Sequence, residues 1–301
     1  MKILVTGAAG FLGTRLCTYL HDGGDEVVAL DKEDLRRLES VSRFGIGWDI
    51  RDDSKISKLV HVLGDVRACV HLAAIAAPRQ AQADQHLAWD TNVRGTQNVL
   101  SLCRAAGIRK VVFASSAHVY GISPRYMPTD EQHPLHPLDT YTATKIAGEE
   151  LCRLHHASHG ISTTILRLFN AYGPGQSPDY FLGVKLSQAL AGGPITVANG
   201  AVTKDWVYVD DVVRAFALAA RTPYVGPLNV GTGVETSLFD MASKIGGLTG
   251  LPVVPDPAVD VGPTRMCCDP RRALHVLGWS PTVGVDEGLG RLVRDARGAP
   301  A

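Results

Sequence analysis

The sequence predicts an α/β fold: a doubly wound parallel sheet joined to a smaller, discontinuous C-terminal α/β lobe. Two observations carry this prediction. Between residues 2 and 168, short apolar runs that are typical of buried strands alternate with longer helical patterns, and such alternation indicates a parallel sheet with right-handed crossovers. Beyond residue 175, proline and glycine become frequent and the apolar runs become shorter, which indicates a smaller and less regular lobe.

A glycine-rich turn separates the first predicted strand, Lys2 to Thr6, from the first predicted helix. Gly7, Gly10 and Gly13 are spaced as G-x-x-G-x-x-G. Glycines at this place let the backbone approach a pyrophosphate, which then lies at the N-terminus of the helix, as in Rossmann-type dinucleotide-binding folds. The alternative is a tight turn that serves only the packing of the helix.

The second predicted strand, Glu26 to Leu30, is followed by an acidic residue, Asp31. A carboxylate at this position accepts hydrogen bonds from the adenosine ribose hydroxyls of a bound dinucleotide. Because it also repels a 2′-phosphate, we expect NAD rather than NADP as the cofactor. Lys32, Arg36 and Arg37 follow closely and are the argument for the opposite preference.

Further stretches have the pattern of strands in the same sheet, namely residues 45–48, 68–71, 110–115 and 163–168. The third of them predicts a buried strand, and Ser115 and Ser116 lie at its carboxyl end. Open α/β sheets place their ligands at this end of the strands, so we expect the two hydroxyls to face a crevice. Later in the chain, residues 204–220 and 227–230 predict a return to the sheet.

Tyr141 and Lys145 lie at the start of a predicted helix that extends to about His159 and that Asp139 or Thr140 can cap. Residues four apart share one face of a helix, so a phenol and an ammonium would meet near the serine hydroxyls. A phenol has a pKa of about 10, which a nearby cation lowers. Tyr141 could then exchange a proton with a substrate hydroxyl; the alternative is an ordinary surface pair.

The composition argues against several classes of protein. The chain has 301 residues, of which 45% are hydrophobic and 20% charged, and its formal net charge is zero, so we expect no binding to nucleic acid or to a membrane surface. The six cysteines show no metal-ligand spacing, which predicts buried free thiols and no metal site. A strand pattern from residue 2 leaves no room for a signal peptide, and no apolar run is long enough to span a bilayer. We therefore expect a cytoplasmic protein.

Beyond these features, an ordered set of short motifs extends through the chain. The motifs are Gly7/Gly10/Gly13, Asp31, Asp49-Ile50, His71-Leu72-Ala73-Ala74, Asn92-Val93-x-Gly95-Thr96, Ser115-Ser116-Ala117-x-Val119-Tyr120-Gly121, Tyr141-x3-Lys145, Arg167-x-Phe169-Asn170-x-Tyr172-Gly173-Pro174, residues 205–211 and Asn229-Val230-Gly231-Thr232-Gly233. In this order they resemble the extended short-chain dehydrogenase/reductases of the NAD-dependent sugar-nucleotide epimerase/dehydratase family, and UDP-glucose 4-epimerases in particular. The resemblance covers essentially the whole chain.

The change in composition and the predicted return to the sheet divide the chain into two domains: a dinucleotide-binding domain of residues 1–170 and 206–233, and a substrate-binding domain of residues 171–205 and 234–301. The resemblance implies NAD as the cofactor, a nucleotide sugar as the substrate, and a homodimer formed through helices beside the site. The residues that it places at the cofactor are Gly7, Gly10, Phe11, Leu12, Gly13, Asp31, Asp49, Ile50, Leu72, Ala73, Ala74, Asn92, Ser115, Tyr141 and Lys145.

A Ser-Tyr-Lys active site is the second implication of the resemblance. Ser116 would hydrogen-bond the reacting oxygen, Tyr141 would be the base, and Lys145 would hold the nicotinamide ribose and lower the pKa of the tyrosine. The cofactor would supply the hydride chemistry. Return of the hydride to the other face of a keto sugar makes an epimerase, which we expect to act at C4. The alternatives are a sugar or nucleotide-sugar dehydrogenase or ketoreductase, and a non-catalytic NAD-binding scaffold protein.

Several positions depart from the family pattern. Ala117 and His118 stand where 4,6-dehydratases carry an Asp-Glu pair, which argues against that reaction. His118 would contact the substrate either as an additional acid or base, since an imidazole titrates near neutrality, or through a hydrogen bond alone. Asn170 matches an asparagine that contacts the diphosphate, whereas Lys204 replaces the usual arginine and cannot form a bidentate contact. Arg265 is either a second phosphate contact or an ordinary surface residue, so a free sugar acid or another small substrate stays open.

Overall fold

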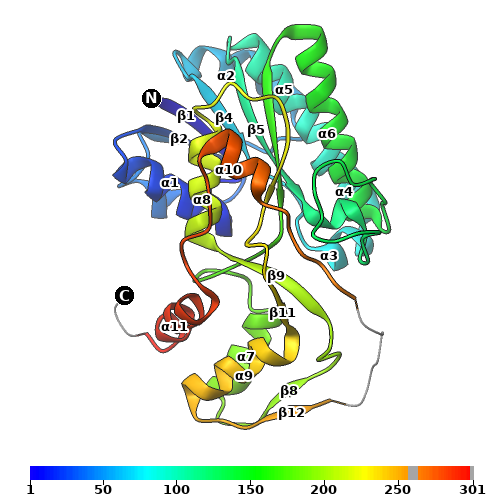
Figure 1. Ribbon diagram of the computed structural model, residues 1–301. Helices are drawn as coiled ribbons and strands as arrows, with labels where there is room; N and C mark the ends of the chain where they lie inside the picture. Colours follow the sequence, from blue (N-terminus) through cyan, green and yellow to red (C-terminus); the bar gives the residue numbers. More distant parts are fainter. Residues whose placement is uncertain (257–263, 299–301) are drawn as a thin grey trace.

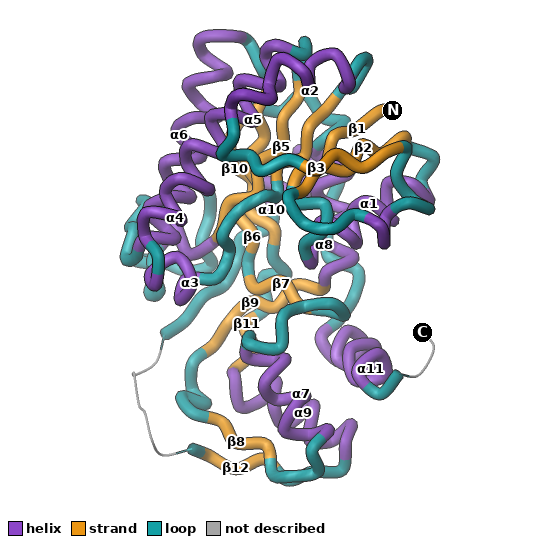
Figure 2. The backbone as a smooth tube through the Cα atoms, turned by 180° about the vertical axis from the view of Figure 1, so that it is seen from behind, coloured by secondary structure: helices purple, strands orange, loops and turns teal. Residues whose placement is uncertain are grey.

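A seven-stranded parallel sheet forms the larger lobe (Figure 2). In the computed structural model, which describes residues 1–256 and 264–298, its strands are β1 (Lys2–Thr6), β2 (Glu26–Asp31), β3 (Phe44–Gly47), β4 (Ala68–His71), β5 (Lys110–Ser116), β6 (Ser162–Leu168) and β10 (Gly226–Val230). They are arranged in the order β10-β6-β5-β4-β1-β2-β3, and all neighbouring pairs are parallel. The order reverses beside β1, and open α/β sheets bind their ligands at such a point. The predicted doubly wound parallel sheet is confirmed.

Helices cover both faces of this sheet (Figure 1). One face carries α1 (Phe11–Asp22), α8 (Val209–Ala219) and α10 (Arg271–Leu277), and the other carries α2 (Ile56–Leu63), α5 (Gly95–Ala105) and α6 (Thr140–His159). The short helical segments are η1 (Arg36–Leu38), η2 (Asp53–Lys55), α3 (Pro78–Ala83), α4 (Gln85–Trp89), the π-helical turn η3 (Asp90–Arg94) and η4 (Ala117–Tyr120). Val5 and Val70 belong to the first core, whereas Leu4 and Cys69 belong to the second. Because both faces are covered, the strands are apolar throughout rather than alternating.

The smaller lobe combines two small sheets with three helices. Its elements are β7 (Asn170–Tyr172), α7 (Phe181–Leu190), β8 (Ile195–Val197), β9 (Thr203–Tyr208), β11 (Glu235–Ser237), α9 (Leu238–Thr249), β12 (Val253–Pro255) and α11 (Val285–Ala296). The predicted return of residues 204–208 to the main sheet is wrong, because β9 pairs with β7 and β11 instead. An apolar run shows that a strand is buried, but it does not identify the sheet to which the strand belongs. The following helix α8 and strand β10 do return to the larger lobe.

The chain returns from the smaller lobe to the larger one at helix α10. Ala273, Leu277 and Trp279 belong to the same core as Val5, and the indole N–H of Trp279 donates to the carbonyl oxygen of Asp211 at 2.9 Å. These residues fall in the range 234–301 that was predicted to belong to the substrate-binding domain, of which residues 257–263 and 299–301 lie outside the described part of the chain. The two-domain division stays a prediction, and the segment 234–301 contributes both to the core around Val5 and to a core of the smaller lobe, the latter through Met241 and Leu289.

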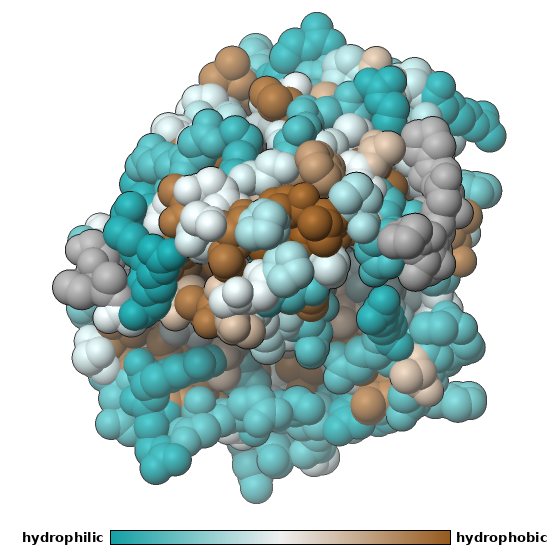
Figure 3. Space-filling model, turned by 90° about the horizontal axis from the view of Figure 1, so that it is seen from below, coloured by the Kyte–Doolittle hydropathy of each residue, from teal (hydrophilic) through white to brown (hydrophobic). Residues whose placement is uncertain are grey.

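The outer end of the smaller lobe carries a patch of apolar side chains (Figure 3). The elements at this end expose Leu190 of α7, Leu248 of α9 and Val254 of β12.

Among the residues that the structure describes, no helix is long and apolar enough to cross a membrane. All six cysteines are free thiols, and five of them are buried.

Candidate active site

Asp139 determines where helix α6 begins. Its carboxylate accepts a hydrogen bond from the backbone N–H of Thr142 at 2.7 Å, and the hydroxyl oxygen of Thr142 accepts one from the backbone N–H of Asp139 at 3.1 Å. This reciprocal arrangement is a capping box. It holds the first turn of the helix, which carries the buried phenol of Tyr141, and the next turn, which carries the buried ammonium of Lys145.

Ser116 is the last residue of β5 and brings a hydroxyl to Tyr141. Burial raises the pKa of Tyr141 to about 12, and the hydrogen bond with Ser116 acts in the opposite direction. The net shift is therefore opposite to the lowering that we expected from Lys145. The physical reason is that removal of the phenol from water disfavours the phenolate, and this effect is the largest one at Tyr141.

The ammonium of Lys145 lies over the ring of Tyr141. Its Nζ donates to the carbonyl oxygen of Ala114 at 2.9 Å, and it lies 5.8 Å from the centre of the Tyr141 ring and 5.3 Å from that of Phe113. Burial lowers the pKa of Lys145 to about 8. The structure thus brings a hydroxyl, a phenol and an ammonium together at the carboxyl end of β5, and the catalytic roles of these groups stay a prediction.

His118 lies in η4, two residues beyond Ser116, and its backbone N–H donates to the Ser116 hydroxyl oxygen at 3.2 Å. Burial, together with the positive charge of Lys204, lowers the pKa of His118 to about 4, although Asp139 acts in the opposite direction. The imidazole is therefore neutral at pH 7. A neutral imidazole can donate or accept a hydrogen bond, but it carries no extra proton for general acid catalysis.

The glycine turn after β1 forms a close-packed cradle. Gly7 has a φ of 71°, and a Cβ added there would lie 2.6 Å from the backbone nitrogen of Ala73, while a Cβ on Gly13 would lie 2.0 Å from the carbonyl oxygen of Gly7. No side chain caps the N-terminus of α1 at Gly10, so its first backbone N–H groups can serve an anion. Asp31 is held beside the turn, because its Oδ2 accepts from the backbone N–H of Ala9 at 2.9 Å. These features fit the pyrophosphate and adenosine ribose of NAD.

Most of the other residues that were predicted to contact the cofactor lie just after the carboxyl ends of β1, β3 and β4. They are Phe11 and Leu12 in the first turn of α1, Leu72, Ala73 and Ala74 after β4, and Asp49 and Ile50 after β3. Asp49 forms an ion pair with Arg51, with 2.5 Å between Oδ2 and Nη2, and this partner lowers the pKa of the Asp49 carboxyl. The carbonyl oxygen of Ile50 accepts a hydrogen bond from Asn98 at 2.8 Å.

Asn92 and Ser115, also predicted at the cofactor, have protein partners. The Asn92 side chain accepts from the backbone N–H of Ile75 at 2.8 Å and donates to the Ile75 carbonyl oxygen at 3.1 Å and to the Thr144 hydroxyl at 2.9 Å. The hydroxyl of Ser115 donates to Glu149 at 2.6 Å. Both side chains therefore hold the loop and helix around the site, and any contact with a cofactor would come in addition.

The three residues predicted to contact the substrate diphosphate lie in the smaller lobe or at its edge. Lys204 on β9 is half-buried, and its charge acts on His118. Asn170 begins β7, the strand next to β9. Arg265 is exposed and forms an ion pair with Glu235, with 2.5 Å between Nη2 and Oε2. Lys204 thus joins the site, whereas the charge of Arg265 is compensated by a carboxylate.

Two features near the site were not predicted from the sequence. Tyr180, which precedes α7, adds to the rise in the pKa of Tyr141, so the smaller lobe reaches the phenol. Glu149 is fully buried on α6 and bound to the buried Arg167. Two signals in the sequence indicate this buried pair. Glu149 continues the spacing of four residues from Tyr141 to Lys145, and Arg167 is a charged residue inside the apolar strand β6. Nothing in the sequence marks Tyr180.

Comparisons with known proteins agree with this geometry. The family model described as NAD dependent epimerase/dehydratase family matches residues 3–231. A UDP-glucose 4-epimerase from Mycolicibacterium smegmatis is 37% identical over 311 residues, covering 97% of each chain. Among solved structures, the UDP-glucose 4-epimerase of Thermotoga maritima with UDP-glucose has a TM-score of 0.90 at 28% identity, covering 99% of each chain. The UDP-glucuronic acid 4-epimerase of Bacillus cereus, in complex with UDP-glucuronic acid and NAD, has a TM-score of 0.88 at 31% identity, again covering 99% of each chain. The chain that carries this glycine cradle, Asp31 and parallel sheet therefore belongs to the NAD dependent epimerase/dehydratase family.

Proposed function

We propose that the protein is an NAD-dependent sugar-nucleotide epimerase that inverts C4 of the sugar through a transient keto sugar. The observation that carries the proposal is the meeting of Ser116, Tyr141 and Lys145 at the carboxyl end of β5. Its support is the full-length similarity to a UDP-glucose 4-epimerase. UDP-glucose and its C4 epimer UDP-galactose are therefore the first substrates to test.

The chain's own residues move the proton, while a bound NAD would supply the hydride chemistry. Tyr141 takes the proton of the C4 hydroxyl as this carbon is oxidised and gives it back in the return step. The Ser116 hydroxyl donates a hydrogen bond to the same oxygen. Because burial raises the pKa of Tyr141 to about 12, the phenol must lose its own proton before it can take the proton of the C4 hydroxyl. A nearby cation favours the phenolate, which is the role we assign to Lys145.

Groups from both lobes hold the substrate in this proposal. The ammonium of Lys204 and the amide of Asn170 bind the nucleotide diphosphate, and Arg265 adds a weaker attraction because Glu235 compensates its charge. The neutral imidazole of His118 hydrogen-bonds the sugar. This assignment is supported by the action of the Lys204 charge on His118, which brings a cation of the smaller lobe to the serine end of the site.

Turnover of nucleotide sugars by the purified protein tests the proposal. We expect interconversion of UDP-glucose and UDP-galactose, followed by NMR, with NAD retained through purification and no net NADH. A dehydrogenase would instead form NADH in proportion to the sugar consumed. UDP-glucuronic acid in a parallel reaction tests a uronic acid as the substrate.

Tyr141→Phe should abolish turnover and leave the bound NAD unchanged, because only the phenol hydroxyl is removed. Tyr126→Phe is the matched control: Tyr126 is exposed, and its hydroxyl donates to Asp130. Turnover that survives in Tyr141→Phe would refute the assignment of the base.

A homodimer formed through α4, α5 and α6 is the second part of the proposal. Trp89 of α4 is 44% exposed and Leu154 of α6 is 57% exposed, and an open hollow of about 830 Å³ is lined in part by α4, η3 and α6, among them Val93 of η3 and Leu151 of α6. Large exposed apolar side chains on a shared face are typical of self-association.

Light scattering should give twice the chain mass of 32.1 kDa. Leu154→Glu should give the mass of one chain, while Leu190→Glu, at an exposed leucine of the smaller lobe, should leave the dimer intact. A monomeric wild-type protein would contradict the dimer.

The compartment that we propose is the cytoplasm. Six free thiols without a disulfide are typical of a reducing environment. Cell fractionation should recover the protein with cytoplasmic markers, and recovery from an oxidising compartment would contradict this assignment.

A further inference from the structure

Glu149 is a fully buried carboxylate on the face of α6 that carries the candidate catalytic residues. It follows Lys145 by four residues and Tyr141 by eight, so the three side chains lie in one stripe along the helix. Its oxygens accept hydrogen bonds from Arg167, with 2.9 Å from Nε and 2.6 Å from Nη2, and from the Ser115 hydroxyl at 2.6 Å. Arg153 adds a longer contact of 3.3 Å.

These contacts join α6 to the two strands that end at the site. Ser115 lies directly before Ser116 on β5, and Arg167 is its partner in register on β6. The carboxylate therefore ties the helix that carries Tyr141 to the strand end that carries Ser116. A small sliding of α6 along the sheet would break this set of charged hydrogen bonds, so Glu149 holds the phenol in register with the serine hydroxyl.

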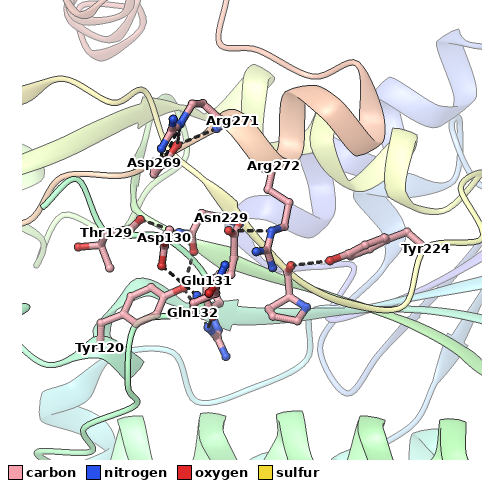
Figure 4. Close-up of polar contacts among 12 residues, drawn as sticks. Tyr120, Thr129, Asp130, Glu131, Gln132, Tyr224, Asn229, Asp269, Arg271 and Arg272 are labelled. Carbon is pink, nitrogen blue, oxygen red and sulfur yellow. Dashed lines mark hydrogen bonds and ion pairs between the residues drawn. The ribbon is translucent and has the colours of Figure 1, made fainter. Parts of the chain in front are cut away.

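The same network continues on the far side of Arg167. Arg167 Nη1 donates to the Tyr120 hydroxyl at 2.9 Å, and that hydroxyl donates to the side chain of Asn229 at 2.7 Å. The backbone N–H of Asn229 donates to Glu131 at 2.8 Å, and Glu131 forms an ion pair with Arg272 at 3.2 Å (Figure 4). Arg167 is thus held from two sides, which makes it a fixed anchor for Glu149.

Glu149 is also the carboxylate that acts on Lys145. The groups of β4 and β5 near this ammonium are His71, the Phe113 ring and the Ala114 carbonyl oxygen, and those of α6 are Tyr141, Cys152 and Glu149. Burial lowers the pKa of Lys145, whereas Glu149 raises it. His71 adds no opposing positive charge, because its pKa is lowered to about 3 and it is neutral.

We propose that Glu149 is a positioning residue for proton transfer, which holds Tyr141 in register with Ser116 and keeps Lys145 protonated. The inference rests on the proposed roles of Tyr141 and Lys145. A buried ion pair is a poor source of stability, since an apolar pair of similar volume often serves as well. The contacts here instead give the Glu149 charge a function, because its loss would leave two buried cations, Arg167 and Lys145, without the carboxylate that acts on both.

The test compares Glu149→Gln with Glu150→Gln and Ser115→Ala through the pH dependence of kcat. Glu150 is the matched control, since it is the next residue, is exposed and forms an ion pair with Arg153. In Glu149→Gln the alkaline fall of kcat should move to lower pH by about one unit or more, with kcat lowered roughly tenfold or more by misplacement of the phenol. Glu150→Gln should match the wild type.

Ser115→Ala separates position from charge, because it removes one hydrogen bond and leaves the carboxylate and its ion pair with Arg167 in place. It should lower kcat without moving the alkaline limb, and Glu149→Asp should likewise keep the limb in place. If Glu149→Gln does not fold, a wild-type kcat in Ser115→Ala overturns the inference. If it folds, an unmoved alkaline limb overturns it. Tyr141→Phe, measured alongside, distinguishes the two failures: turnover in that variant refutes the proposed function, whereas its inactivity beside a wild-type profile in Glu149→Gln refutes only the present inference.

Discussion

The two halves of the candidate site are built differently. In the half supplied by the larger lobe, Ser116, Tyr141 and Lys145 are buried, and each has a protein partner. In the half supplied by the smaller lobe, Lys204 is half-buried and Arg265 is exposed, and the strands β7 and β11 have three residues each. The groups proposed for the reaction are therefore held before a substrate arrives, whereas the groups proposed to meet its diphosphate are more open to solvent.

The difference between the two halves predicts which kinetic constant each substitution should change. Groups that are held in place act mainly in the reaction step, so their loss lowers kcat, while groups that only attract the substrate change KM. A buried cation and a half-buried cation of the same type, Lys145 and Lys204, allow the comparison to be tested with one kind of substitution. The following predictions run from the largest expected effect to the smallest.

Lys145→Met should have the largest effect. It removes the cation that favours the phenolate of Tyr141, and we expect kcat to fall by about 10² or more. The melting temperature should not fall, because the substitution also removes a buried ammonium whose loss of hydration opposes folding. Steady-state kinetics and thermal unfolding at pH 7 check both expectations. A variant with nearly wild-type kcat would remove Lys145 from the reaction.

The pH dependence sharpens the same comparison. Lys145 has a pKa of about 8 in the folded protein, against an ordinary value of 10.5, so wild-type activity should fall as the pH rises through 8. The unfolded chain binds the Lys145 proton more tightly than the folded one, and stability therefore rises with pH between these two values as far as this group is concerned. The stability advantage of Lys145→Met should accordingly be full below pH 8 and shrink toward pH 10.5. An advantage that does not change with pH would show that Lys145 is not desolvated.

Lys204→Met should change KM rather than kcat. Loss of a charged contact to the diphosphate should raise KM for a nucleotide sugar by roughly ten- to hundredfold, while the groups around Tyr141 keep their positions. Initial rates over a range of substrate concentrations separate the two constants. A fall in kcat of the same size would mean that the smaller lobe also sets the reaction geometry, and the two halves would then not be distinct.

The sequence predicted the larger lobe well because its signals are local. The runs before Gly7 and Asp31 are strands that need only be buried on both faces. The turn requires glycine because a Cβ at Gly7 would lie only 2.6 Å from the backbone nitrogen of Ala73. Tyr141 and Lys145 could be paired from helical spacing alone. The pairing of β9 could not be predicted, because its apolar residues are as suitable for the small sheet as for the large one.

The balance of effects at each ionisable group could not be predicted either. A cation four residues from Tyr141 suggested a lowered pKa, but burial of the phenol is the larger effect and raises it to about 12. Similarly, the near-neutral titration expected of His118 is shifted to about 4 by burial and by Lys204, a residue far away in the sequence. Such shifts depend on distances between elements, which no spacing along the chain contains.

His118→Gln should have a moderate effect, because His118 lies in η4 of the larger lobe and is acted on by the charge of Lys204 from the smaller lobe. Glutamine can replace a hydrogen bond of a neutral imidazole, so we expect a loss in kcat/KM of about three- to tenfold and an unchanged pH profile above pH 5. Rates measured from pH 5 to pH 9 test this. A loss of about a hundredfold or more, together with the disappearance of a limb of the profile, would identify His118 as an acid or base in the reaction.

Arg265→Ala should have the smallest effect, because the guanidinium is exposed and already bound to Glu235. Exposed ion pairs contribute little, so KM should change by about twofold or less and kcat should not change. Glu235→Gln makes this a sharper test, since it frees the guanidinium while leaving the Thr203 contact available to the amide. If Arg265 attracts the diphosphate, Glu235→Gln should lower KM, and Arg265→Ala in the same background should cancel the gain. Equal KM values in all three variants would make Arg265 an ordinary surface residue and would leave Lys204 as the cation that distinguishes the smaller-lobe half of the site.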